Sequence, residues 1–294
     1  MLAHARLKAV LVQAGGDMAL AAARLFEDTQ VREREPRYTV GRVLGQGLTA
    51  TVYHARREHE TEPLVPFPEG ADTFAMKVMF VKTGGLSRRF QDQRRDVERE
   101  LQFSLEAEAL GVGPAVYDWG LYMYDEPELA TLDPTRDVYH GTSEYDDEDE
   151  PPRVLGYYFI VIEELAVRLD TYLDTHPLTR TLIADIGTAF TKLVDAGIAH
   201  GDLGAQNVML DHAGRVYVID YGFATSFDEI EDTTDPEKLA NAKKSYVANN
   251  LAYMLGFTIQ YNSAWPIGSK SKALAVAKEL FYPDMVPDTT AVLG

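Results

Sequence analysis

The hydrophobic and polar positions divide the chain into a strand-rich half and a helical half. Between residues 38 and 165, apolar and β-branched residues gather in short runs, which predict an antiparallel sheet with one long helix among its strands. After residue 169, apolar residues recur every few positions, as expected for helices that bury one face. We therefore expect an α+β fold with two lobes, joined by a connector at 163–168.

The predicted elements follow this division. In the first lobe, strands are expected at 38–44, 51–55, 74–81, 114–124 and 154–165, and a helix at 88–111. That helix has an apolar stripe at Val97, Leu101, Leu105 and Ala109, and Gly111 is the residue type that ends helices in a left-handed conformation. In the second lobe, helices are expected at 169–173, 178–196, 236–261 and 269–281, with two short strands and a turn between 200 and 222.

Two further segments do not belong to this regular pattern. Residues 1–36 show helical spacing that is interrupted at Gly15-Gly16 and stops at Pro36, so we expect an N-terminal helical extension. Residues 125–153 form an acidic, proline-containing insertion, which is either functional or without fixed structure. We accordingly expect three parts: the extension 1–36, a first lobe at 37–165 that includes the insertion, and an abbreviated second lobe at 166–294.

Composition excludes several classes of protein. The chain of 294 residues has no cysteine, which excludes disulfides, thiol catalysis and cysteine-bound metal sites and fits a reducing compartment. No apolar run is long enough to span a membrane, and the N-terminus lacks the apolar core of a secretory signal, so we expect an intracellular, cytoplasmic protein. The formal net charge of -18 argues against nucleic-acid binding and favours a basic protein as substrate.

Three oxygen-bearing side chains lie where apolar segments of the second lobe end. Asp202 follows the long helix, Asn207 comes shortly afterwards, and Asp220 follows the second short strand. Each residue alone could simply cap a turn or a helix. Together they could hold a metal ion and a phosphate chain, because carboxylate and amide oxygens suit Mg²⁺ and phosphoryl transfer needs a carboxylate to orient the incoming hydroxyl.

The first lobe carries a glycine-containing hairpin tip and a lysine within an apolar strand. Gly45 and Gly47 would let the backbone approach a phosphate, although a G-x-G at a strand end is usually only a turn. Lys77 lies in the middle of the third strand, where it either reaches water from a sheet edge or bridges phosphates to a carboxylate. The carboxylates on the following helix that could pair with it are Asp96, Glu98 and Glu100.

The order of these motifs resembles that of the protein-kinase-like superfamily, from about Tyr38 to Tyr261. The resemblance implies a bilobal kinase-like fold and a phosphotransferase that uses ATP and Mg²⁺. It is carried by Gly45-x-Gly47-x-x-Ala50-x-Val52 as the glycine loop, Ala75-Met76-Lys77 as the lysine strand, Ile160–Leu165 as the segment between the lobes, His200-Gly201-Asp202 with Asn207 as the catalytic loop, and Asp220-Tyr221-Gly222 as the metal-binding motif.

The resemblance also implies a role for each residue. Lys77 would hold the phosphates and pair with Glu100, which is favoured over Glu98 by its distance from 111–114, a stretch that resembles the helix end of atypical kinases. Asp202 would orient the acceptor hydroxyl, and Asn207 with Asp220 would hold Mg²⁺. The nucleotide would be bound by Gly45, Gln46, Gly47, Val52, Ala75, Lys77, Met209 and the backbone of Glu163 and Leu165.

Three departures from the protein-kinase pattern bear on the acceptor. Gly201 replaces the usual arginine, Gly204 replaces a lysine that many serine/threonine kinases carry, and no A-P-E sequence follows Asp220. The H-G-D-L sequence resembles RIO-type kinases, the kinase of the KEOPS complex and aminoglycoside phosphotransferases. We expect a serine/threonine protein kinase. The alternatives are a small-molecule kinase of the aminoglycoside or sugar type and a pseudokinase-like binding scaffold.

Overall fold

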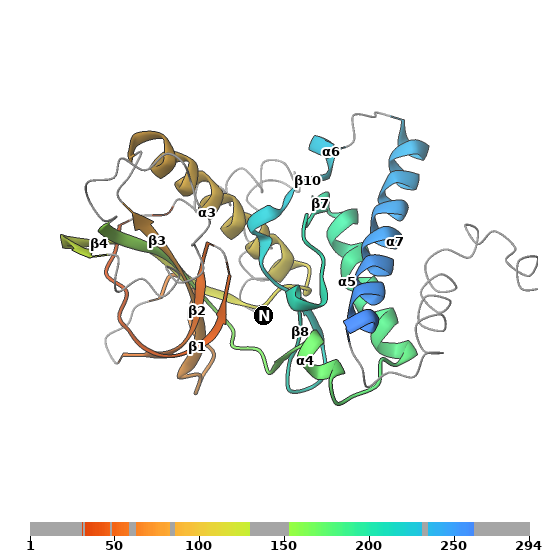
Figure 1. Ribbon diagram of the computed structural model, residues 1–294, viewed down its shortest axis with the longest axis horizontal. Coiled ribbons are helices and arrows are strands. Elements are labelled where there is room, and N and C mark those ends of the chain that lie inside the picture. The colour runs from red at the N-terminus through yellow and green to blue at the C-terminus, as the bar shows by residue number, and fades with distance from the viewer. Residues whose placement is uncertain are drawn as a thin grey trace, which may run out of the picture. The chain divides into compact units, whose positions relative to one another are not determined.

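A computed structural model of the chain describes residues 31, 33–47, 49–58, 63–82, 86–129, 153–230 and 235–261. The chain divides into two compact units, shown in Figure 1. Unit 1 consists of residues 1–109 and 114–164, and unit 2 of residues 110–113 and 165–294. Residues 1–30 of the predicted N-terminal extension, the predicted helix at 269–281 and most of the predicted insertion, 130–152, lie outside the described residues.

Unit 1 is built on a five-stranded sheet in which all neighbouring strands are antiparallel, as predicted. The strand order is β1-β2-β3-β5-β4, so β3 is the central strand. β4 continues beyond the predicted end at Tyr124, so residues 125–129 belong to a strand and not to the insertion. The strands are β1 (Tyr38–Gln46), β2 (Thr51–Arg57), β3 (Thr73–Lys82), β4 (Val116–Leu129) and β5 (Arg153–Ile162).

Both faces of this sheet are covered by apolar side chains. Helix α3 (Leu86–Ala109) packs on one face, where Leu101 joins Met79 and Ile160 in one hydrophobic cluster. A second cluster covers the opposite face and includes Phe74 and Phe159. Successive residues of a strand point to opposite faces, so β3 reads as a continuous apolar run because both faces are buried.

The segment before β1 corrects one prediction. Residues 33–36 were expected at the end of a helix, but Glu33 bridges Leu121 of β4 and the Arg34 amide donates to the Leu121 carbonyl at 2.8 Å. The Arg34 guanidinium also lies 2.6 Å from Asp118 Oδ1, and the Tyr38 hydroxyl donates to Asp118 Oδ2 at 2.7 Å. Pairing with a strand that is distant in sequence therefore overrides the local helical tendency.

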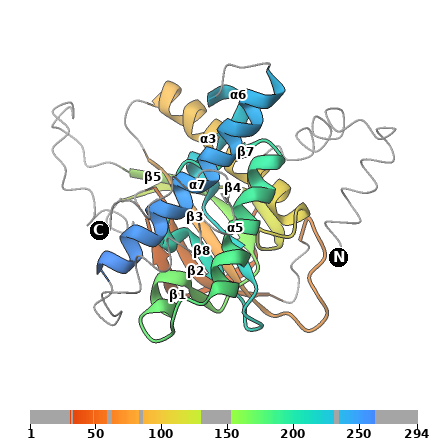
Figure 2. The same ribbon diagram turned by 90° about the vertical axis from the view of Figure 1, so that its right-hand side faces the viewer.

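Unit 2 is mainly helical, as predicted, with short strands at its loops. The two long helices, α5 (Arg180–Asp195) and α7 (Pro236–Tyr261), lie side by side in Figure 2 and pack on each other. α5 begins at an N-cap where the Leu182 amide donates to the Thr179 hydroxyl at 3.1 Å. It is followed by Gly197 at a φ of +86°, a left-handed conformation that glycine adopts readily. α7 has the predicted bounds.

The remaining elements of unit 2 are short. Strands β6, β8 and β9 form a three-stranded sheet, and β7 pairs with β10. None of the helices within the described ranges is both long and apolar enough to cross a membrane. The short elements are β6 (Val167–Arg168), α4 (Leu169–Leu173), β7 (Ile198–Ala199), the 3₁₀ turn η3 (Ala205–Asn207), β8 (Val208–Leu210), β9 (Val216–Val218), η4 (Tyr221–Phe223), β10 (Thr225–Ser226) and α6 (Phe227–Ile230).

Candidate functional site

Lys77 belongs to a row of residues that crosses the whole sheet of unit 1. It pairs with Val52 of β2 on one side and with Ile160 of β5 on the other, and this row continues to Gly45 of β1 and Trp119 of β4. Directly paired residues of neighbouring strands share a face of the sheet. Because Ile160 and Trp119 lie in the cluster beneath α3, the Lys77 side chain also points to the α3 side.

The ammonium group of Lys77 forms an ion pair with Glu100 of α3, where Lys77 Nζ donates to Glu100 Oε1. The two side chains are only 12% and 8% exposed. Of the other acids on α3, Glu98 accepts hydrogen bonds from Arg94 and from the Val31 amide, and Asp96 pairs with Arg99. The structure thus selects Glu100 as the partner and excludes the alternative of an edge-strand lysine that reaches water.

The glycines of the β1–β2 hairpin are not required by the protein itself. The Gly47 amide closes the hairpin by donating to the Ala50 carbonyl at 2.8 Å, and neither Gly45 nor Gly47 has a positive φ. Among the residues that the structure describes, a Cβ built at Gly45 would meet no atom within 4 Å, and one at Gly47 would meet only the Ala50 carbonyl, at 3.6 Å. Side chains would fit here, so the space above both glycines is open to a ligand that approaches the backbone.

The predicted base-binding residues of unit 1 lie next to this row. Ala75 is two positions from Lys77 and shares its face of β3, and Glu163 follows β5 directly. The Glu163 amide donates to the Ala115 carbonyl at 2.8 Å, and the Ala115 amide donates back to the Glu163 carboxylate at 3.4 Å. Since the Glu163 amide is used inside the protein, the backbone group of Glu163 that remains to accept from the amino group of a base is its carbonyl.

In unit 2, a buried histidine shapes the loop that carries Asp202. His200 is fully buried, and its Nδ1 accepts from the Asp202 amide at 3.3 Å while its Nε2 donates to the Ile219 carbonyl at 2.9 Å. With one nitrogen accepting and the other donating, the imidazole is neutral and satisfied. His200 therefore links the loop to the chain just before Asp220 and does not act as a base.

Asn207 connects Asp202 to the neighbouring hairpin. Its amide Nδ2 donates to the Asp202 carbonyl and to Asp202 Oδ2, both at 2.8 Å. Asn207 is buried, whereas Asp202 is exposed and can meet an acceptor. Because both amide protons are used, only the Oδ1 oxygen of Asn207 remains to bind a cation.

Asp220 lies at the same end of the β8–β9 hairpin as Asn207. Val208 pairs with Val218, and the Ile219 amide donates to the Asn207 carbonyl at 2.9 Å, so residues 207 and 220 lie on neighbouring strand ends. Asp220 has a φ of 66°, which is uncommon for a residue other than glycine and often marks a functional position.

Asn207 and Asp220 fit part of a Mg²⁺ site. No group of three or more histidine, aspartate or glutamate side chains that could hold a metal occurs among the described residues. One amide oxygen and one carboxylate suit a hard cation that takes its other ligands from phosphate oxygens and water. The donor set thus agrees with a cation that accompanies a nucleotide.

Gly201 has a structural role that sequence reasoning missed. Its φ is +81°, and a Cβ there would lie 2.4 Å from the Phe223 carbonyl oxygen. Its amide donates to the Tyr246 hydroxyl at 3.1 Å, which ties the loop to α7. An arginine cannot occupy this position without moving the backbone, so the glycine follows from the fold of the loop. At Gly204, by contrast, the atoms nearest to a Cβ would belong to the side chain of the exposed Gln206, which can rotate away.

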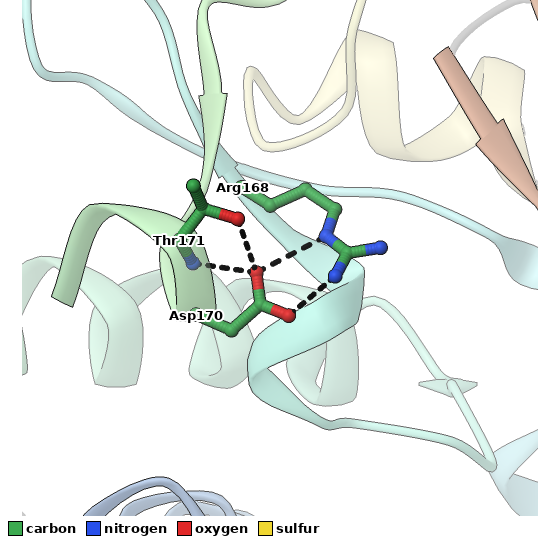
Figure 3. Close-up of polar contacts among 3 residues, drawn as sticks. All are labelled: Arg168, Asp170 and Thr171. Atoms are coloured by element: carbon green, nitrogen blue, oxygen red, sulfur yellow. Dashed lines mark hydrogen bonds and ion pairs between the residues drawn. The ribbon is translucent and has the colours of Figure 1, made fainter. Parts of the chain in front are cut away.

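The predicted base-binding residue of unit 2, Met209, lies beside a polar cluster. Met209 is half-buried in β8 and pairs with Arg168 of β6. As Figure 3 shows, Arg168 donates to the two carboxylate oxygens of Asp170 at 3.1 and 2.5 Å, and the Thr171 amide donates to Asp170 Oδ1 at 2.7 Å. The other predicted residue, Leu165, is buried at the start of this unit. The cluster fixes the first turn of α4, whose residues the sequence analysis did not single out.

Comparisons with known proteins find similarity to a kinase family and to several named proteins. A family model described as the lipopolysaccharide kinase (Kdo/WaaP) family matches residues 157–248, from β5 into α7. The KEOPS complex subunit Bud32 of Pyrococcus abyssi is 41% identical over 66 residues, which make up 22% of this chain and 30% of that protein.

Two further relatives are named as protein kinases. The serine/threonine-protein kinase CBK1 of Candida albicans is 26% identical over 139 residues, 42% of this chain and 18% of that protein. The probable serine/threonine-protein kinase FPV226 of fowlpox virus is 32% identical over 75 residues, 24% of this chain and 26% of that protein. The chain therefore spans less than a third of the length of each of these curated relatives.

Proposed function

We propose that this chain belongs to the protein-kinase-like superfamily and is an ATP-dependent phosphotransferase that transfers the γ-phosphate to a hydroxyl group. The observation that carries the proposal is the pair of hydrogen bonds from Asn207 to Asp202 at the hairpin end next to Asp220. This arrangement holds an exposed carboxylate beside two potential cation ligands, which is what phosphoryl transfer requires.

Each unit supplies part of the chemistry. In unit 1, Lys77 binds the phosphates and Glu100 keeps its ammonium group in place, while the open backbone at Gly45 and Gly47 admits the phosphate chain. In unit 2, Asp202 orients the acceptor hydroxyl and takes its proton, and Asn207 with Asp220 holds Mg²⁺. When bound, ATP supplies the phosphoryl group and Mg²⁺ neutralises its charge.

A serine or threonine hydroxyl of a protein is the first candidate acceptor. Its support comes from the relatives named as serine/threonine-protein kinases, two of which are CBK1 and FPV226. The net charge of -18 favours a basic protein as substrate, because opposite charges raise the rate of encounter.

A sugar hydroxyl is the second candidate, in line with the small-molecule alternative. A specific observation favours it: residues 157–248, which include the Asp202 loop, match a family described as lipopolysaccharide kinases. Gly201 also stands where ordinary protein kinases have an arginine, and the left-handed backbone at this position leaves no room for a side chain. A pure binding scaffold is disfavoured, because such proteins commonly lose at least one of Lys77, Asp202, Asn207 and Asp220, all of which are present.

The proposal is tested by incubating the full chain with γ-labelled ATP and Mg²⁺. Basic proteins are offered in one set of reactions, and lipopolysaccharide core sugars or aminoglycosides in another, each with wild type and Asp202→Ala. We expect label on an acceptor that disappears in the variant. Label on small molecules alone would show that the acceptor is a small molecule and not a protein. The absence of transfer in every reaction would support a binding scaffold.

A further inference from the structure

A polar cluster that the proposed chemistry does not use lies at the end of unit 1. His54 Nδ1 of β2 donates to Glu164 Oε2 at 2.8 Å, and the Arg42 guanidinium of β1 lies 3.7 Å from Glu164 Oε1. The His54 and Glu164 side chains are 29% and 22% exposed, whereas that of Arg42 is 72% exposed. The pair of His54 and Glu164 is therefore the more buried part of the cluster, with Arg42 at its rim.

The sheet places His54 beside the predicted base-binding residues. His54 pairs with Ala75 of β3, and it lies two positions from Val52 on the same face of β2. The pair of His54 and Ala75 therefore lies two residues along the strands from the pair of Val52 and Lys77. A nucleotide whose phosphates lie at Lys77 and whose base lies over Ala75 would have His54 at its outer edge.

The neighbouring strand is shaped to accommodate this histidine. The β1–β2 register is irregular between Val40 and Val43, and a Cβ built at Gly41 would lie 3.3 Å from both Cδ2 and the carbonyl oxygen of His54. A larger residue at 41 would press on the imidazole. Bulges of this kind redirect side chains, and here Arg42, within the irregular stretch, reaches the same carboxylate as His54.

Glu164 is the residue through which the histidine acts. It directly follows Glu163, whose carbonyl is the group left to receive the amino group of a base. Glu163 is held to Ala115, the residue before β4, and Glu164 is held to β2 by His54. The backbone that would recognise the base is therefore fixed at two consecutive residues by two different parts of unit 1.

We propose that His54, acting through Glu164, is a positioning residue for the base of the nucleotide. The inference rests on the proposed ATP-dependent function and adds a residue that the motif resemblance does not include. Loss of the hydrogen bond frees the Glu164 end of the connector, so the base binds less tightly. Transfer from bound ATP continues at its normal rate, because Lys77 and Glu100 are untouched.

The test compares variants of the full chain by titration with Mg²⁺-ATP and by steady-state kinetics. His54→Ala is expected to raise the Kd and KM for ATP about three- to tenfold with kcat unchanged, the size expected for one partly exposed hydrogen bond to a carboxylate. His54→Asn places an amide donor near the position of Nδ1 and should restore most of the affinity. His212→Ala changes an exposed histidine in the β8–β9 turn and serves as the matched control.

Glu164 provides the second arm of the experiment. Glu164→Ala should raise KM at least as much as His54→Ala does, and the double variant should be no worse than Glu164→Ala, because Glu164→Ala already removes the contact with His54. A KM that stays at the wild-type value in both single variants, or a loss confined to kcat, overturns the inference. If the wild type itself binds no ATP, the proposed function fails, and the inference falls with it.

Discussion

The Lys77 ammonium and the Glu100 carboxylate form a buried ion pair between the central strand of unit 1 and its only described long helix, α3. Burying two charges costs hydration energy that their attraction often does not recover. Such a pair therefore contributes little to stability, and under the proposed function the lysine is kept at this place to bind the phosphates of the nucleotide.

The first prediction separates the stability of this pair from its function. Lys77→Met leaves the Glu100 carboxylate buried without its ion partner and should cost about 3 kcal/mol of unfolding free energy. The double variant Lys77→Met/Glu100→Leu replaces both charges by apolar groups of similar volume and should regain most of that loss while remaining inactive. Urea unfolding and ATP turnover measure the two effects. A double variant as unstable as the single one would contradict this account.

Removal of the Asn207 amide should affect the use of Mg²⁺ as well as turnover. Asn207→Ala deletes the hydrogen bonds to Asp202 and the proposed cation ligand, so we expect kcat to fall by about a hundredfold and half-saturation to need more Mg²⁺. Activity is measured over a range of Mg²⁺ concentrations. The neighbouring, exposed Gln206→Ala is the control. An unchanged Mg²⁺ requirement in Asn207→Ala would remove Asn207 from the metal site.

Substitutions at two glycines should affect different properties, one the stability of the protein and the other its binding of ATP. Gly201→Ala forces a side chain into a left-handed backbone and against the Phe223 carbonyl, so it should destabilise the protein by about 1–3 kcal/mol. Gly45→Ala meets no atom of the described part of the chain, so it should leave the unfolding free energy nearly unchanged and weaken ATP binding. Thermal unfolding and ATP titration distinguish the two. Equal destabilisation by both substitutions would show that the hairpin glycine is structural.

Glu108 of α3 should make unit 1 less stable as the pH rises to neutrality. Burial raises the pKa of this carboxyl to about 7, and the nearby Glu163 charge also raises it. Because the folded state holds the proton more tightly than the unfolded chain, the contribution of Glu108 to stability is greatest below its ordinary pKa of 4.5 and is lost as the pH rises through about 7.

The corresponding variant is Glu108→Gln, which keeps an oxygen to accept from the Val116 amide but cannot ionise. It should exceed the wild type in unfolding free energy at pH 8 by about 1–3 kcal/mol and match it near pH 4.5. Urea unfolding at several pH values measures the difference, with the exposed Glu69→Gln as control. A constant difference at all pH values would argue against the raised pKa.

Several elements that rest on local patterns were predicted correctly. The sheet of unit 1 and the bounds of α4 and α7 follow from periodicity and from breakers such as Gly197, which act within a few residues. The choice of Glu100 over Glu98 followed from its distance to the helix end, and the structure places Glu100 beside Lys77.

Features that depend on partners distant in sequence were missed or wrong. Glu33 pairs with Leu121, and no local pattern near residue 33 indicates a strand edge. The contact of His54 with Glu164 depends on the register of β2 and on a bulge in β1, which a single sequence does not determine. The sequence shows that residue 201 is a glycine. It does not show that the φ of this residue is left-handed or that the Phe223 carbonyl lies against it.

The central claim is that Asp202 serves phosphoryl transfer from ATP, and a single-turnover reaction tests it most directly. The full chain is mixed with γ-labelled ATP, Mg²⁺ and whichever acceptor is labelled in the screen, and the wild type is compared with Asp202→Ala and with Asp228→Ala, an exposed aspartate of α6. The account predicts transfer by the wild type and Asp228→Ala, and a loss of about a hundredfold or more in Asp202→Ala with ATP binding retained. Equal transfer by the wild type and Asp202→Ala would contradict it.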